Sequence, residues 1–417
     1  MEFIEITEKD EYENFVLNHP KSHFMQSFAW GEVMKHKNFE PHYVIMKDEE
    51  SIVASALLLK KKLFKGYSYY YIPRGFMLDY HNNDILKEFT NYIKKYAKKN
   101  KAIYVKIDPD IKLHCLDIDG NVISADNEFP LIKKLEELGF RHMGFYKDFS
   151  GEQPRYTFRL DLSKDWDSIY GAIHPTTRKI LNKGNQYELN IYKGNINDID
   201  DFYQTMIETA EREGIKQKSL DYYKNFYTIL NEQNMSDLYI VKVNISNLKR
   251  TFRKHVENIQ NEIDELNSTE YKNVDKKNNL LNDLIKKHTK AKQECIELDN
   301  LNKNEIILSS IITVKYGDKV WTIHGGNSTL LRNLNSNYLL YHEIIKNAHS
   351  EGYKVIDFFG TSGDANPDKD NPIYGIHNFK KRLGGEYVEF IGEFDLITNK
   401  LMYFLYKKLI PIYRKMK

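Results

Sequence analysis

The chain has 417 residues, 41% of them hydrophobic, and a formal net charge of +2 from 61 Lys and Arg against 59 Asp and Glu. This composition excludes a wholly disordered chain, and the length predicts two or three domains. The two cysteines form no Cys-x-x-Cys pair, which excludes a disulfide framework and a cysteine-rich metal site. The longest apolar run, residues 52–59, is far shorter than the roughly 20 residues of a membrane-spanning helix. We therefore expect a cytoplasmic protein with no more than peripheral membrane contact.

Residues 1–150 alternate between helical and strand-like patterns. Apolar residues at helical spacing predict a helix over residues 24–36, with Ser22 as its N-cap. The β-rich run 102–107 ends at Asp108-Pro109, which is a turn signal. The other predicted elements are strands over 42–46, 52–59 and 67–72 and helices over 83–98 and 127–138, the last with Gly139 as its C-cap. This alternation is typical of a layered α/β unit.

The second half of the chain also alternates between helical and strand-like patterns, on either side of residues 245–305. The predicted strands cover 157–162, 238–243, 306–314, 319–324 and 354–359, and the predicted helices cover 166–179, 199–213, 220–230 and 338–350. Two successive α/β units of similar size indicate an internal structural duplication, although the residues themselves show no repeat.

The segment between the strands 238–243 and 306–314 contains no Gly or Pro and carries two heptad seams. The seam residues are Leu248, Phe252, Val256, Ile259, Ile263 and Leu266, then Leu280, Leu284, His288, Ala291, Cys295 and Leu298. Residues 267–269 form the expected turn between them. The pattern predicts an inserted hairpin of two antiparallel helices. It is either a stiffening or dimerisation arm or a nucleic-acid-contacting arm, and its mixed charges weaken the second interpretation.

Common catalytic signatures are missing from the sequence, including G-x-S-x-G, the Walker loop and H-E-x-x-H. The histidines lack metal-ligand spacing, and neither Cys115 nor Cys295 has an evident activating neighbour. We therefore expect no metal and no cofactor. Catalysis that uses neither a metal nor a cysteine nucleophile depends on positioning, acid–base groups and stabilisation of an oxyanion.

Four segments carry candidate functional groups. Residues 105–110 present carboxylates at a strand end, where a base commonly lies, although a strand-ending turn also favours Asp. Residues 174–183 combine hydroxyls and cations that suit phosphate, although a solvated helix face has much the same composition. The polar run 360–370 follows an apolar strand, and ligands of open α/β sheets bind beyond the carboxyl ends of strands. Residues 374–382 place three adjacent cations beside aromatic side chains.

Several short motifs occur in a specific order and spacing along the chain. They are QSFAWGEV at 26–33, PRGF at 73–76, KIDPD at 106–110, PDKD at 367–370, YG at 374–375 with FKK at 379–381, and IGEFD at 391–395. With the helical hairpin, which some members have at this point, they resemble the FemABX family of peptidoglycan bridge-forming aminoacyltransferases. The resemblance covers nearly the whole chain.

The resemblance implies an α/β fold of two N-acetyltransferase-like domains with the helical hairpin inserted. The first domain would comprise residues 1–150 and 392–417, because the C-terminal helix returns to it. The second domain would comprise 151–245 and 305–391, and the arm 246–304.

The resemblance also implies an activity. An amino acid, here expected to be glycine, moves from aminoacyl-tRNA to the side-chain amine of residue 3 of the peptidoglycan precursor. The precursor is lipid II or UDP-MurNAc-pentapeptide. No acyl-CoA is involved, and the sequence shows no convincing glycine-rich pyrophosphate loop. Transfer of serine or alanine by the same chemistry is the first alternative.

Family positions that bind the precursor or the transition state correspond to particular residues here. They are Lys35 (within one residue), Lys218, Tyr222, Thr322, His324, Phe379 and Lys380, with the family's acid–base carboxylate at Asp108. Lys218 replaces an arginine and loses its bidentate fork. Thr322 and His324 replace tyrosines. The cations Arg178, Lys179 and Lys183 form a weaker candidate site for tRNA phosphates.

An aminoacyl ester is already activated, so no covalent enzyme intermediate is required. Lys380 would stabilise the oxyanion, and Asp108 would take the proton or orient the amine. We expect orientation, because an exposed Asp is a weak base near pH 7. Two other classes stay open: a non-catalytic tRNA-binding adaptor and a transferase acting on protein N-termini.

The C-terminal segment predicts a helix whose apolar residues, Leu401, Phe404, Leu405 and Leu409, dock on the first domain up to Pro411. Three of the last four residues are cationic. We expect residues 411–417 to give weak, salt-sensitive attachment to the anionic inner face of the membrane.

Overall fold

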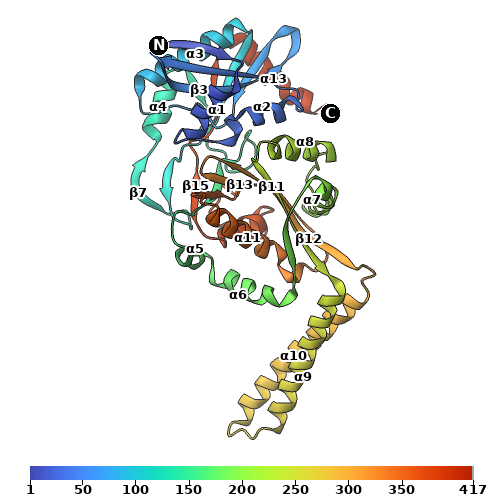
Figure 1. Cartoon of the computed structure of the whole chain (residues 1–417). Helices are drawn as coiled ribbons and strands as arrows, with labels where there is room; N and C mark the ends of the chain where they lie inside the picture. The colour runs from blue at the N-terminus through green and yellow to red at the C-terminus, as the bar shows by residue number, and fades with distance from the viewer. Residues whose placement is uncertain (416–417) are drawn as a thin grey trace.

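The computed structural model describes residues 1–415, except for the side chains of Asn185 and residues 409–415. Two seven-stranded sheets lie one above the other, and a pair of helices projects from the second (Figure 1). The architecture is therefore mixed α/β, as the alternating patterns predicted.

The first sheet has the strand order β1-β2-β3-β4-β5-β16-β8. Its strands are β1 Glu2–Ile6, β2 Glu40–Asp48, β3 Ser51–Lys62, β4 Ser68–Ile72, β5 Ala102–Ile107, β16 Phe394–Ile397 and β8 Phe140–His142. Its helices are α1 Lys9–Asn18, α2 Phe28–Lys35, α3 Asn83–Lys99, α4 Phe129–Glu137 and α13 Lys400–Lys415. A small separate hairpin pairs β6 His114–Leu116 with β7 Val122–Asn127.

The second sheet has the order β10-β11-β12-β13-β14-β9-β15. Its strands are β10 Asn190–Gly194, β11 Ser236–Asn244, β12 Glu305–Tyr316, β13 Lys319–Asn327, β14 Val355–Asp357, β9 Tyr156–Asp161 and β15 Glu386–Glu389. Its helices are α5 Trp166–Ala172, α6 Pro175–Gly184, α7 Ile199–Glu213, α8 Leu220–Asn231, α11 Ser336–Ser350 and α12 Tyr374–Lys381.

The two sheets match strand for strand. Each contains one parallel pair, β4 with β5 in the first and β13 with β14 in the second. In each, the sixth strand comes from the opposite part of the chain: β16 follows β15 of the second sheet, and β9 follows β8 of the first. The duplication expected from the element pattern is therefore present as topology, and the two halves are tied together by exchanged strands.

Two local predictions about helices were wrong. Helix α2 begins after Ser27, whose side chain accepts from the Trp30 amide, whereas Ser22 lies before the preceding 3₁₀ turn and caps neither element. The single helix predicted over 166–179 is two helices, because Pro175 begins α6 and the residue before a proline disfavours the helical conformation.

The projecting arm consists of α9 Ile245–Ser268 and α10 Val274–Asp299, which lie side by side (Figure 1). In the outer half, Ile259, Ile263 and Ala291 are buried against Val256, Leu281 and Leu284. Leu280, predicted as a seam residue, is 41% exposed. At the base, Leu248, Phe252 and Leu298 belong to the core of the second sheet. The arm is therefore self-packed only beyond its first turns.

A shared core joins the two halves. The ring of Phe24 lies 5.1 Å from that of Trp321 on β13, and Trp30 on α2 lies 6.2 Å from Phe226 on α8. These buried residues belong to one hydrophobic cluster that draws on both sheets. The relative position of the two sheets is thus fixed by packing, which allows one site to use residues from both.

Candidate active site

Asp108 lies directly after β5 and is buried, with 4% of its surface exposed. The Tyr71 hydroxyl donates to its Oδ2 (2.9 Å), and the Arg74 backbone amide donates to its Oδ1 (2.6 Å). Burial raises the pKa of Asp108 to about 7, against the lowering effects of the Arg74 charge and these hydrogen bonds. The expectation of an exposed Asp108 was wrong, and with it the reason for preferring orientation over proton transfer.

Arg74 adopts the left-handed conformation, with φ of 59°, which is uncommon for a residue with a side chain. This conformation turns its amide toward Asp108, and Gly75 beside it also has positive φ. The Arg74 guanidinium lies over the ring of Phe390, 4.9 Å from its centre. The motif PRGF therefore forms the wall that holds the acid.

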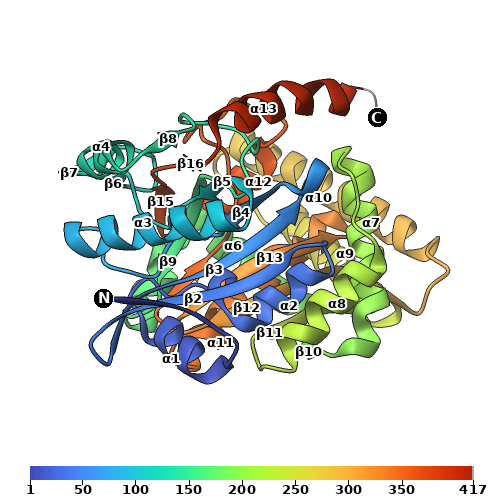
Figure 2. The ribbon, with the colours of Figure 1, turned by 90° about the horizontal axis from the view of Figure 1, so that it is seen from above.

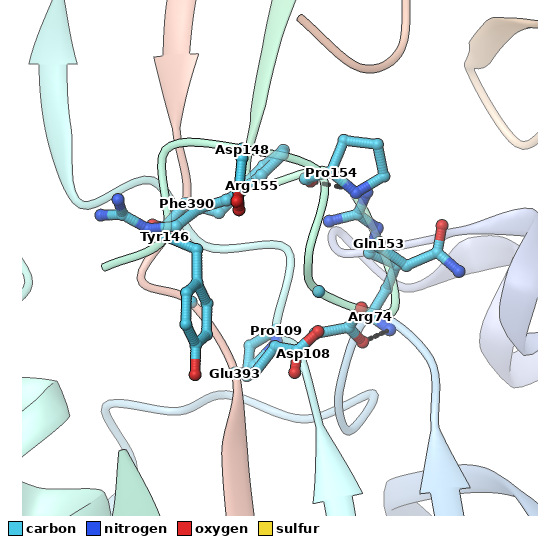
Figure 3. Close-up of a pocket in the computed structure, with 12 residues that line it drawn as sticks. Arg74, Asp108, Pro109, Tyr146, Asp148, Gln153, Pro154, Arg155, Phe390 and Glu393 are labelled. Carbon is cyan, nitrogen blue, oxygen red and sulfur yellow. Dashed lines mark hydrogen bonds between the residues drawn. The ribbon is translucent and has the colours of Figure 1, made fainter. Parts of the chain in front are cut away.

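A cavity opens beside Asp108 at the junction of the two halves (Figure 3). Asp108 and Glu393 lie close together at one end, and the Tyr146 side chain extends toward them. The segment between β8 and β9 covers the cavity; it contributes Tyr146, Asp148, Gly151, Gln153, Pro154 and Arg155. The acid thus faces a partly covered cavity.

Glu393 is held by the Lys106 ammonium, whose Nζ is 2.7 Å from Oε2. The same ammonium is 3.1 Å from Oδ1 of Asp395, a fully buried carboxylate. The charge of Glu393 raises the pKa of Asp108 further. The motifs KIDPD and IGEFD therefore meet here, because β16 pairs with β5.

Lys380, on α12, is also buried, with 6% of its surface exposed. Its Nζ donates to the carbonyl oxygens of Phe359 and Gly360, each at 2.6 Å, in the loop after β14. Burial lowers the pKa of Lys380 to about 7, and the charge of Asp357 opposes that shift. Phe359 has a φ of 57°, so this strand end, like the one at Arg74, carries a left-handed residue.

Arg159, on β9, connects the two strand ends. Its Nη2 lies 2.6 Å from Oδ2 of Asp110, and its Nε lies 2.8 Å from Oδ2 of Asp357. Asp110 is two residues beyond Asp108, and Asp357 accepts from the Phe359 amide. Lys380 is not among the described residues that line the cavity, and the Arg159 bridge joins the loop that holds it to the segment that follows Asp108.

A second polar cluster lies where α2 approaches α8. The Nζ atoms of Lys37 and Lys218 lie 4.8 and 4.5 Å from the ring centre of Tyr222, whose hydroxyl is 3.2 Å from Nε2 of His324. Loss of hydration and the Lys37 charge lower the pKa of Lys218 to about 8. Lys35 is exposed and pairs with Glu32 at 2.6 Å, so Lys37 is the lysine at this cluster.

The remaining predicted residues are separated. Thr322 is buried on β13. The Phe379 ring packs on Tyr338 and Tyr341 of α11, with both ring centres 4.8 Å away. On α6, Lys179 and Lys183 are exposed and Arg178 is half-buried. The His174 amide, at the start of α6, donates to the Arg382 carbonyl one residue beyond α12.

Sequence reasoning missed Arg74, Arg159 and Lys37 as site residues. Arg74 stood inside a quoted motif, so its signal was available. Arg159 lies in an ordinary strand pattern, and only the pairing of β9 with β14 reveals its role.

No cluster of three or more potential metal ligands occurs in the described part of the chain. None of its helices is both long and apolar enough to cross a membrane.

Two seven-stranded sheets of the same strand order and pairing, tied together by exchanged strands, define a duplicated α/β protein. A model of the FemAB family matches residues 7–410. A lipid II:glycine glycyltransferase of Staphylococcus epidermidis is 30% identical over 424 residues, covering 100% of this chain and 98% of the relative. The Staphylococcus aureus protein of the same name is 28% identical over 433 residues, with the same coverage. A crystal structure of FemX has a TM-score of 0.77 at 28% identity and covers 97% of this chain and 99% of its own. The chain belongs to the FemAB family.

Proposed function

We propose that this protein transfers glycine from glycyl-tRNA to the side-chain amine of the third stem-peptide residue of lipid II, which starts the interpeptide bridge. Full-length similarity to lipid II:glycine glycyltransferases supports the reaction. The observation that carries the chemistry is geometric: a buried carboxylate, Asp108, and a buried ammonium, Lys380, lie at equivalent strand ends that Arg159 bridges. Burial shifts the pKa of each to about 7.

Asp108 is the general base in this proposal. A base is most effective when its pKa lies near the working pH, and burial gives Asp108 a pKa of about 7. The acceptor amine attacks the ester carbonyl while Asp108 takes its proton. The Tyr71 and Arg74 hydrogen bonds fix the carboxylate so that one oxygen faces the cavity.

Lys380 stabilises the oxyanion that forms on the ester carbonyl. An ammonium has three N–H donors, and the carbonyls of Phe359 and Gly360 take two of them. The third has no partner among the described residues, and a substrate oxygen that reaches this buried ammonium would gain most from such a donor. Collapse of the intermediate expels the tRNA ribose oxygen, which takes up the proton.

The precursor's diphosphate fits the cluster of Lys37, Lys218 and Tyr222. Burial and, after it, the Lys37 charge lower the pKa of Lys218, and a bound dianion would offset the repulsion between these two ammonium groups on one aromatic ring. A lipid-linked and a soluble UDP-linked precursor share this diphosphate. Peripheral contact with an anionic membrane follows for the lipid-linked form. The side chains of the basic tail, 411–417, lie outside the described residues.

The tRNA backbone fits the exposed cations of α6. That helix starts beside Arg382 and ends at the base of α9, where Tyr187 stacks on Phe252 and Glu188 pairs with Arg250. A surface hollow on α9 is lined by Ser246, Lys249, Arg250, Arg253, Lys254 and Glu257. Cations therefore extend from the region of Lys380 to the arm, which suits a phosphate backbone.

Strand membership supports the domain division into 1–150 with 392–417, 151–245 with 305–391, and an arm at 246–304. The base of the arm shares the core of the second domain.

The direct test supplies purified protein with lipid II and separately charged glycyl-, seryl- and alanyl-tRNA, and identifies the product by mass spectrometry. We expect one glycine on the third stem residue. Transfer of serine or alanine would change the donor and leave the chemistry intact. Modification of a peptide N-terminus in place of lipid II, or binding of tRNA without transfer, would overturn the proposed function.

A further inference from the structure

The C-terminal helix α13 docks on the first domain by a different face from the one that its sequence predicted. Tyr403 is buried and packs with Met402 and Tyr406 against Tyr104 and its neighbours. The Tyr403 hydroxyl donates to Oδ2 of Asp395 (2.7 Å), and Lys407 pairs with the same carboxylate. Tyrosines with buried hydrogen-bond partners thus replace the leucine stripe as the docking side.

The described residues of the predicted stripe face outward instead. Leu401, Phe404 and Leu405 are 68%, 54% and 40% exposed, and they occupy one face of the helix because they are spaced by three and four residues. Lys400 and Lys408 are exposed on the same helix, with Lys408 Nζ 4.4 Å from the Phe404 ring centre. Figure 2 shows α13 along the outer edge of the molecule.

A neighbouring turn extends this surface. Leu63 and Tyr67 join the cluster that holds α13, and between them Phe64 is 38% exposed. Lys62 and Lys65, on either side of Phe64, are also exposed. From 400 to 408 and from 62 to 67 the sequence contains five lysines and no acidic residue.

We propose that Leu401, Phe404, Leu405 and Phe64 dock onto an anionic lipid surface, with the surrounding lysines at the level of the lipid phosphates. Outward apolar side chains bordered by cations are the pattern of a helix lying in a membrane interface. A second copy of the chain would bring like charges together at this face, which disfavours self-association. The inference rests on the proposed function, because a lipid-linked acceptor keeps the enzyme at such a surface.

The location suits that acceptor. Lys61, from the same strand end, donates to the Lys37 carbonyl at 2.5 Å, and Lys37 lies over Tyr222 in the proposed diphosphate cluster. The apolar face therefore borders the place where the headgroup of a membrane-bound precursor would enter.

The test measures binding of the full chain to vesicles of phosphatidylcholine alone or mixed with phosphatidylglycerol. The variant Leu401→Ser/Phe404→Ser/Leu405→Ser should bind anionic vesicles roughly tenfold or more weakly. The control Val122→Ser/Ile123→Ser changes residues that are 59% and 66% exposed on β7 and should bind as the wild type does. Circular dichroism and thermal melts check that both variants fold.

Activity separates this inference from the proposed function. The triple variant should transfer to a soluble UDP-linked precursor at the wild-type rate and lose transfer to lipid II in vesicles. A wild type that transfers to neither acceptor yet binds anionic vesicles would refute the function and retain the docking face. Unchanged vesicle binding in the triple variant, equal wild-type binding to neutral vesicles, or dimerisation lost with the stripe would overturn the docking proposal.

Discussion

The ends of β5 and β14 occupy the same place in two matching sheets, yet they carry opposite chemistry. After β5 the chain supplies Asp108, and a backbone amide from a left-handed residue, Arg74, holds its carboxylate. After β14 the left-handed residue is Phe359, and its carbonyl holds the ammonium of Lys380. Burial shifts both pKa values toward 7, one upward and one downward. The two equivalent strand ends of the duplicated scaffold thus hold different groups, a carboxylate at one and an ammonium at the other.

The sheets also differ at the turn between their second and third strands. In the first sheet only Glu49 and Glu50 separate β2 from β3, whereas in the second the whole arm lies between β11 and β12. An insertion is tolerated there because the two strands remain paired on either side of it. Its base has nevertheless become part of the core.

The largest expected effect comes from removing the base. Asp108→Asn keeps the size and the hydrogen-bond acceptor for Arg74 but cannot take a proton at neutral pH. We expect turnover to fall roughly 10²–10⁴-fold, the range for loss of a general base. Asp119→Asn, at an exposed position, is the control. Near-normal turnover of Asp108→Asn would leave orientation of the amine as its role.

Lys380→Ala should lower turnover by roughly 10²–10³-fold, as loss of one oxyanion donor does. It also leaves two carbonyls without their partner, which costs about 1–3 kcal/mol each if water does not replace it. Lys381→Ala removes the neighbouring ammonium, which pairs with Asp119, and should leave turnover nearly unchanged. Because the variant can also lose stability, its turnover is compared with its urea unfolding curve. Nearly full activity of folded Lys380→Ala would remove Lys380 from the mechanism.

Arg159→Lys tests whether the two strand ends act together. A lysine keeps one charge but cannot bridge Asp110 and Asp357 with a planar fork. We expect kcat to fall about tenfold with little change in KM, because positioning in the transition state is lost. The exposed Arg141→Lys is the matched control. A change confined to KM would show that the bridge serves substrate binding.

The smallest effect on activity is expected at the outer arm. Replacing residues 258–292 with a short Gly/Ser linker should leave thermal stability nearly intact, because that part packs on itself. Replacing 248–301 should destabilise the protein by several kcal/mol, at roughly 2–5 kcal/mol for each large core residue removed. The lost core residues are Leu248, Phe252 and Leu298. Equal melting temperatures for the two deletions would place the base outside the core.

Periodicity predicted most of the long elements, because a buried helix face or strand leaves a local pattern; α7 and β5 have the predicted bounds. Periodicity did not predict features that depend on residues far away in the sequence. The burial of Asp108 depends on the segment between β8 and β9. The docking face of α13 depends on the hydrogen bond from the Tyr403 hydroxyl to the buried carboxylate of Asp395. The sequence pattern does not distinguish Lys35 from Lys37. The approach of α8 to α2 does, because it brings Tyr222 under Lys37 while Lys35 pairs with Glu32.

The pH dependence of kcat/KM in single turnovers tests the opposed roles of Asp108 and Lys380 most directly. Asp108 must be unprotonated, so the rate should rise with pH up to its raised pKa of about 7. Lys380 must be protonated, so the rate should fall as pH rises through its lowered pKa of about 7. We predict a narrow bell centred near neutrality and loss of its acidic limb in Asp108→Asn. A wild-type profile that is flat from pH 6 to 8, or an acidic limb that persists in Asp108→Asn, would contradict these roles.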